Sequence, residues 1–232
     1  MIFFSKNNLA VRLIKIFGLL IIMALVCSII FKFQFFNSIT IEDLKFFSEY
    51  YENETQTLNN YHLYLIVTTS FLSLLNYVFF IIFIIWMRNS YRNLRLAQEN
   101  MIYTENWTIW LWIFPILNLI RPYQLIKEMY IKVNYRIYED NNEESINYKL
   151  KILLTWWILL LIYQTFLFIS GEMIFDYYFY ENVLPGLQLG IASDVVGIIA
   201  LTLSIQVVQN YYNLEQELMR KLLAESQKSI YN

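Results

Sequence analysis

The sequence has one cysteine, Cys27, and one histidine, His62. An internal disulfide needs two cysteines, and a His/Cys zinc site needs several ligands, so neither is available to this chain. Nor can a single His and a single Cys, far apart in the sequence, indicate a Cys–His pair or a Ser–His–Asp triad. Glycine-rich phosphate-binding motifs are also absent. We therefore expect no enzyme activity, no catalytic residues, no metal and no cofactor.

Excess charge of either sign is also lacking, because the formal net charge is −2 over 232 residues. Without a basic field, nucleic acid is not an expected partner. What the chain does have is apolar residues, which make up 58% of it. That share is too large for an ordinary soluble domain and predicts a membrane protein. The abundance of Ile, Asn, Lys, Phe and Tyr suggests a bacterial source, and we take the bacterial inner (cytoplasmic) membrane as the location.

Four apolar segments are long enough to cross a hydrocarbon core of about 30 Å as helices. They lie at about 13–36, 63–87, 151–169 and 187–208. The polar segment 209–228 follows the last of them, with Leu214, Leu218 and Leu222 at helical spacing beside Glu215 and Glu217. This pattern predicts a cytoplasmic C-terminal helix. The fold class that we predict is an all-α integral membrane bundle of four transmembrane helices in a single domain.

Segment 107–121 has a different character. Its apolar part, Trp107–Ile120, would reach only about 21 Å as an α-helix, which is too short to span. Pro115 tends to break a helix, and Asn118 can satisfy the backbone groups that such a break frees. We therefore predict a short re-entrant hydrophobic hairpin between the second and third spans. Segment 123–138 follows, and its apolar residues at helical spacing predict an interfacial amphipathic helix.

The distribution of basic residues favours this topology. If 107–121 is re-entrant, all Lys and Arg except Lys32 and Lys45 lie on one side of the membrane, out of a total of 17. If it spanned, six basic residues from Arg121 to Lys151 would move to the other side. Basic residues gather in cytoplasmic loops, so the hairpin is favoured and both termini are expected to be cytoplasmic.

The residues around the hairpin form a recognisable pattern. It consists of Arg88, Arg92, Asn93, Trp107, Trp112, Pro115, Asn118, Leu119, Pro122, Tyr123, Gln124, Lys127, Glu128, Trp156 and Trp157. Over about residues 60–210 the chain resembles the bacterial multi-pass membrane family catalogued as domain of unknown function 4328. That resemblance implies a multi-pass bacterial membrane protein and assigns no activity.

Two interpretations of the hairpin motif are open. In the first, Arg88, Arg92, Arg95 and Arg121 form a basic cytoplasmic patch for anionic lipid head groups, with Gln124 and Glu128 as hydrogen-bonding neighbours. In the second, Lys127 and Glu128 are solvated, and Pro122 and Tyr123 only shape the turn. The hairpin candidates are Trp107, Trp112, Pro115, Asn118, Pro122, Tyr123, Gln124, Lys127 and Glu128.

Asp194 lies about seven residues inside the fourth span, where an unpaired carboxylate is expensive. Counting inward from the outer helix ends places Ser70, Gln164 and Ser28 at a similar depth. We predict an intramembrane polar cluster of Asp194, Gln164, Ser70 and Ser28, or the outer Lys32 in place of Ser28. Such a cluster either stabilises helix packing through interhelical hydrogen bonds or forms a solute or proton site.

These expectations leave two functions. The first is a non-enzymatic scaffold or regulatory component that acts through helix–helix and lipid contacts, with a membrane-protein partner or a second copy of the chain. The alternative is a small channel or transporter that uses the re-entrant hairpin and the cluster around Asp194.

Overall fold

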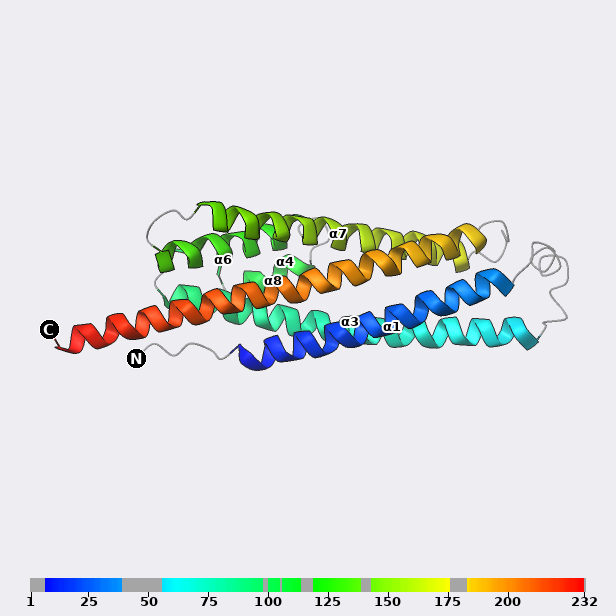
Figure 1. Ribbon diagram of the computed structural model, residues 1–232, viewed down its shortest axis with the longest axis horizontal. Coiled ribbons are helices and arrows are strands. Elements are labelled where there is room, and N and C mark those ends of the chain that lie inside the picture. The colour runs from blue at the N-terminus through cyan, green and yellow to red at the C-terminus, as the bar shows by residue number, and fades with distance from the viewer. Residues whose placement is uncertain are drawn as a thin grey trace. The chain divides into compact units, whose positions relative to one another are not determined.

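The computed structural model describes residues 7–38, 56–97, 100–104, 106–113, 119–138, 143–175 and 183–231. These residues form helices joined by short turns, and no strand occurs among them. In chain order the helices are α1 (Asn8–Ser38), α3 (Gln56–Leu96), α4 (Trp107–Ile113), α6 (Arg121–Tyr138), α7 (Glu143–Phe175) and α8 (Val183–Tyr231) (Figure 1).

Four of these helices are long and apolar enough to cross a membrane. The candidate spans are Asn8–Asn37 in α1, Ile66–Leu96 in α3, Ile146–Met173 in α7 and Leu184–Lys228 in α8. The predicted all-α class with four membrane-spanning helices is thus confirmed. Pro185 interrupts none of them, because it lies in the first turn of α8, where a missing N–H breaks no intrahelical hydrogen bond.

The predicted hairpin is described in part. Its first arm is α4, which has only 7 residues, and the chain resumes as α6 at Arg121. Helices α4 and α6 contact each other. Residues 114–118, including Pro115 and Asn118, lie outside the described residues, so the re-entrant turn itself stays a prediction.

The chain divides into two compact units that share the four long helices. Unit 1 comprises Met1–Ile16, Phe79–Trp157 and Leu203–Asn232, and unit 2 comprises Phe17–Val78 and Ile158–Thr202. Helices α4 and α6 belong wholly to unit 1. Every basic residue except Lys32 and Lys45 also falls in unit 1.

Unit 1 has an aromatic core. Trp86 and Tyr211 are fully buried and meet edge to face, with ring centroids 5.8 Å apart. Phe83 packs against Trp86 at 5.3 Å and against Trp156 at 5.8 Å. Such pairs add about 0.5–1.5 kcal/mol each beyond the burial of their area, so the aromatic residues fix how the helix segments of this unit pack.

Helix α6 joins this core through one face. Its buried residues are Pro122, Leu125, Ile126, Met129, Tyr130, Val133, Asn134 and Ile137, which recur every three or four positions. The Tyr130 hydroxyl donates a 2.6 Å hydrogen bond to the Val207 carbonyl oxygen. Burial raises the pKa of Tyr130 above its ordinary value, so this hydroxyl stays a donor at neutral pH.

Unit 2 is built from the remaining parts of α1, α3, α7 and α8. Ile21, Leu25 and Tyr163 are buried in it. Leu187 is also buried, with Phe31, Phe35 and Leu184 packed around it. Close packing of α7 against α8 depends on Gly197, because a Cβ there would stand 2.7 Å from Cε2 of Tyr163.

Candidate functional site

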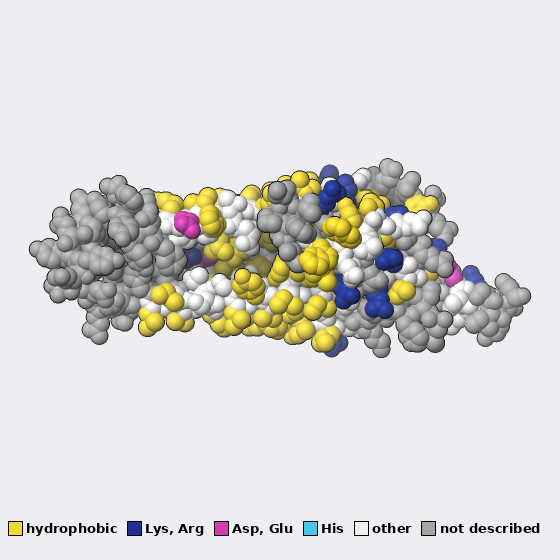
Figure 2. Space-filling view, turned by 180° about the vertical axis from the view of Figure 1, so that it is seen from behind, with side chains coloured by type: hydrophobic (Ala, Val, Ile, Leu, Met, Phe, Trp, Pro, Cys, Tyr) yellow, Lys and Arg dark blue, Asp and Glu magenta, His cyan; other side chains and the backbone are white. Residues whose placement is uncertain are grey.

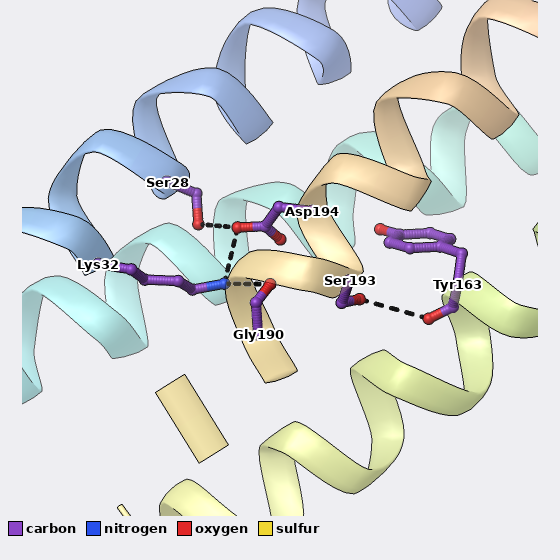
Figure 3. Close-up of polar contacts among 6 residues, drawn as sticks. All are labelled: Ser28, Lys32, Tyr163, Gly190, Ser193 and Asp194. Atoms are coloured by element: carbon purple, nitrogen blue, oxygen red, sulfur yellow. Dashed lines mark hydrogen bonds and ion pairs between the residues drawn. The ribbon is translucent and has the colours of Figure 1, made fainter. Parts of the chain in front are cut away.

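Unit 2 contains an ion pair between two of its helices. Lys32 Nζ of α1 lies 2.7 Å from Asp194 Oδ2 of α8, and the two side chains are 12% and 2% exposed. Ser28 donates a second hydrogen bond, of 2.8 Å, to the same Asp194 oxygen. Lys32 also donates to the Gly190 carbonyl oxygen at 3.3 Å (Figure 3). Asp194 is therefore charge-compensated, as a carboxylate at this depth must be.

Two residues allow the pair to approach so closely. A Cβ at position 190 would lie 3.2 Å from Lys32 Nζ and 3.2 Å from Ser170 Oγ, so Gly190 leaves room for the ammonium group against the α8 backbone. Ser28 is one turn before Lys32 on α1, which places both side chains on the same helix face. In Figure 3 the Tyr163 hydroxyl points toward Asp194 from α7.

A cavity of about 170 Å³ opens beside this pair within unit 2. Ser28, Lys32 and Asp194 form part of its wall. Other polar lining residues are Thr68, Thr69, Ser73 and Asn76 of α3 and Tyr163 and Ser170 of α7. The α3 residues fall at i, i+1, i+5 and i+8, which is one face of a helix. The cavity thus places several hydroxyl and amide groups in a wall that Leu25, Leu72 and Leu167 otherwise make apolar.

The structure brings together only part of the predicted polar cluster. Ser28 and Asp194 are hydrogen-bonded, and Lys32 belongs with them rather than replacing Ser28. Ser70 and Gln164 are exposed and do not line the cavity, so their assignment to the cluster was wrong. Counting residues from a helix end gives depth but not the direction of a side chain.

A face count would have found the missing lining residues. Thr69, Ser73 and Asn76 follow a helical spacing on α3, and Tyr163 is the neighbour of Gln164 on α7. These residues were accessible to sequence reasoning as a polar stripe. The prediction used depth alone and therefore chose Ser70, whereas the adjacent residue Thr69 lines the cavity.

Glu128 of the hairpin motif has a structural role that the sequence did not reveal. Its Oε1 accepts a 2.8 Å hydrogen bond from the Ile102 backbone N–H, and Tyr91 donates to Oε2 at 3.4 Å. The Tyr103 backbone N–H donates to the Tyr91 hydroxyl at 2.8 Å. Residues 102–103 are thereby tied to both α3 and α6. The expectation that Glu128 is solvated was wrong in this respect.

The neighbouring motif residues extend the same set of contacts. Arg121 donates to the Tyr103 hydroxyl at 2.8 Å and to Gln124 Oε1 at 3.0 Å. Of the other two predicted turn residues, Pro122 is buried in the first turn of α6 and Tyr123 is half-buried. Lys127 is exposed.

The tryptophans of the motif differ in their surroundings. Trp107 is 44% exposed. Trp112 is half-buried between Phe80, at a centroid distance of 5.0 Å, and Trp157, at 6.1 Å. The Trp157 indole N–H donates a 2.9 Å hydrogen bond to the Leu119 carbonyl oxygen, which fastens the chain just before α6 to α7.

The four arginines of the predicted lipid patch are all exposed residues of unit 1. Arg88, Arg92 and Arg95 follow one another on α3 at spacings of four and three, and Arg121 opens α6. Lys and Arg side chains gather on the face seen in Figure 2. The arrangement provides cationic groups that an anionic head group could contact.

Glu215 of α8 is a buried carboxylate that sequence analysis did not single out. It lies in the polar segment 209–228, but its side chain is 2% exposed. The Asn7 side-chain amide donates to both carboxylate oxygens, at 3.1 and 3.0 Å, and Asn93 donates to Oε1. Asn7 also donates to Ser90 Oγ at 2.8 Å. Leu214 and Leu218 are buried beside it, so these leucines could have indicated an inward face.

Metal-binding geometry does not occur in the described part of the chain, where no three His, Cys, Asp or Glu side chains group closely enough to hold an ion.

The four span-length helices and the buried ion pair between two of them define a multi-pass helical membrane protein. The family model described as "Domain of unknown function (DUF4328)" matches residues 54–213, so the chain belongs to that family, as its hairpin motif predicted. No curated protein and no solved structure matches it.

Proposed function

We propose that this protein is a non-enzymatic scaffold or regulatory component of the bacterial cytoplasmic membrane that acts through neighbouring helices and anionic lipids. The observation that carries the proposal is the segregation of charge. Unit 1 holds all but two of the 17 basic residues, and its four motif arginines are exposed. The positive-inside rule then favours a cytoplasmic side for unit 1 and for both termini.

The apolar surface supports the part of the proposal that concerns neighbouring helices. Large exposed hydrophobic side chains occur on each long helix, for example Leu19, Phe71, Phe168 and Ile199. Hydrophobic side chains also cover much of the face in Figure 2. Lipid tails or the helices of a partner, including a second copy of the chain, are the surroundings that such faces fit.

Lipid preference tests the proposal directly. Native mass spectrometry of the detergent-solubilised protein, titrated with phosphatidylglycerol or phosphatidylcholine, should show several-fold more bound phosphatidylglycerol. The quadruple change of Arg88, Arg92, Arg95 and Arg121 to alanine should abolish that preference.

The matched control removes four other cationic side chains of unit 1. Changing Lys127, Lys149, Lys151 and Lys228 to alanine should leave most of the preference intact. An equal loss in both variants would mean that diffuse charge attracts the lipid. No preference in the unchanged protein would contradict the proposal.

A small channel or transporter is the second candidate function, and one observation favours it. The cavity of about 170 Å³ places hydroxyl and amide groups from α3 and α7 beside the Lys32–Asp194 pair. Polar recesses of this kind in spanning helices mark solute pathways in other membrane proteins. Solute flux into proteoliposomes, with Asp194→Asn as the comparison, separates this candidate from the first.

A further inference from the structure

We infer that the cavity of unit 2 is a binding site for a small uncharged polyhydroxy solute of about the size of glycerol. This inference deepens the second candidate function and rests on it for any role in transport. The ligand class follows from three properties of the cavity, which are its size, its charge balance and the hydroxyl groups that line it.

Size limits the ligand first. The cavity holds about 170 Å³, and a cavity of roughly 150 Å³ in another protein is large enough for benzene. A solute of about six non-hydrogen atoms therefore fits. A six-carbon polyol, with about twice as many atoms, does not.

Charge balance excludes ions. Lys32 and Asp194 neutralise each other at 2.7 Å, and the Ser28 hydroxyl donates a further hydrogen bond to the same carboxylate oxygen. An anion or a cation would have to displace one partner and leave the other charge buried and unpaired, which is costly. An uncharged solute leaves the pair intact.

The side chains that line the cavity offer hydrogen bonds to an uncharged ligand. Thr69, Ser73 and Asn76 line the cavity from one face of α3, and Ser170 lines it from α7. Hydroxyl groups can both donate and accept. The Asn76 amide already donates a 2.9 Å hydrogen bond to the Leu72 carbonyl oxygen, so the hydroxyl groups of Thr69, Ser73 and Ser170 are the main groups that a ligand could contact. Lys32 has three donor hydrogens, of which the two observed hydrogen bonds use two. A ligand with several hydroxyl groups matches these mixed donors and acceptors better than an apolar one.

The test measures binding separately from flux. Saturation-transfer NMR on the full chain in nanodiscs uses four probes, which are glycerol, sorbitol, acetate and methylammonium. Glycerol should receive saturation from the protein, and the other three should receive at least fivefold less. Equal transfer to glycerol and sorbitol, or stronger transfer to either ion, would overturn the inference.

Two isosteric variants locate the site. Thr69→Val removes a lining hydroxyl, and combined with Ser73→Ala it should reduce the glycerol signal at least fivefold. Thr202→Val is the matched control, because Thr202 is exposed and its hydroxyl bonds only the Ile198 carbonyl of its own helix in the described contacts. A loss in both variants, or in neither, would contradict the assignment to this cavity.

Glycerol-driven swelling of proteoliposomes then tests transport by itself. Binding without accelerated swelling would support the binding site and contradict the transport function. Swelling could also stay accelerated in the Thr69→Val/Ser73→Ala variant while no binding at the cavity is found. That result would contradict the binding site and support the transport function.

Discussion

Two buried carboxylates dominate at the residue scale, and each is stabilised differently. Asp194 has a cation, Lys32, and a hydroxyl group, Ser28. Glu215 has two amide donors, Asn7 and Asn93, within unit 1. Both arrangements supply the partners that a carboxylate needs when it leaves water. Their substitutions should therefore give different patterns of stability loss.

Breaking the ion pair from one side should cost more than removing it whole. Lys32→Met or Asp194→Leu alone should lower the free energy of unfolding by about 3 kcal/mol, because a buried charge loses its partner. The double variant should lose clearly less than the sum. Chemical denaturation in detergent micelles measures this double-mutant cycle.

The exposed pair of Arg136 and Glu225 is the control for that cycle. Its side chains are 32% and 42% exposed and 3.0 Å apart, so the coupling energy should stay below about 1 kcal/mol. A coupling energy between Lys32 and Asp194 as small as that of the control would show that the pair does not hold the helices together.

Removing the Glu215 carboxylate should destabilise unit 1. Glu215→Leu leaves the Asn7 and Asn93 amides buried without this acceptor, a loss of about 1–3 kcal/mol for a buried group. Glu215→Gln keeps one acceptor oxygen and should cost less. Thermal unfolding in detergent compares both with Glu225→Gln, an exposed control. Equal melting temperatures for Glu215→Leu and the control would contradict the role assigned to Glu215.

Residue-level prediction from the sequence succeeded where a single property decided the outcome. Asp194 was identified because a carboxylate inside an apolar run must find a partner. Ser70 and Gln164 do not join the cavity, because their neighbours on the helix, Thr69 and Tyr163, line it instead. Which face is inward depends on the packing of the other helices, and periodicity is weak in helices that are apolar all round.

At the scale of elements, glycine positions report how closely α7 and α8 pack in unit 2. Gly197→Ala should lower the melting temperature, because its Cβ would overlap the Tyr163 ring at 2.7 Å from Cε2. Gly171→Ala is the matched control, since no atom lies within 4 Å of its added Cβ. That variant should be neutral or stabilising by up to about 1 kcal/mol.

The measurement is thermal unfolding of both glycine variants in the same detergent. A loss of stability in Gly171→Ala equal to that in Gly197→Ala would show that close packing at Tyr163 is not the cause.

The contacts of Glu128 make a second prediction about elements. Glu128→Ala should accelerate hydrogen exchange at the backbone N–H of Ile102, which loses its acceptor at 2.8 Å. Lys127→Ala, at the exposed neighbouring position, should leave that exchange unchanged. Hydrogen–deuterium exchange resolved to single residues measures both, and identical rates in the two variants would contradict this role of Glu128.

The helices themselves were largely predictable. Long apolar runs without proline determined the four spans, and apolar residues at helical spacing indicated α6. Helix α3 is longer than its predicted span of 63–87, whereas α8 continues through segment 209–228, which was also predicted to be helical. A hydropathy pattern indicates where lipid contact ends, whereas the helix ends only where its backbone hydrogen bonds stop.

At the scale of the whole molecule, the distribution of basic residues follows the division of the chain into two units. Unit 1 contains α4, α6 and all but two of the basic residues, and unit 2 contains the polar cavity. The sequence could predict this segregation because the positive-inside rule depends only on counts of Lys and Arg. It could not predict the cavity, which depends on side chains from four separate helices.

The most direct test of the central claim asks whether the chain crosses the membrane between α3 and α7. Single cysteines at Glu99 and Asn141, each in a Cys27→Ser background, flank the stretch in question. A membrane-impermeant maleimide is applied to intact bacterial cells whose outer membrane has been permeabilised. The account predicts that neither cysteine reacts until the inner membrane is broken. Reaction of only one of them in intact cells would show that the stretch spans, and would contradict the four-span topology.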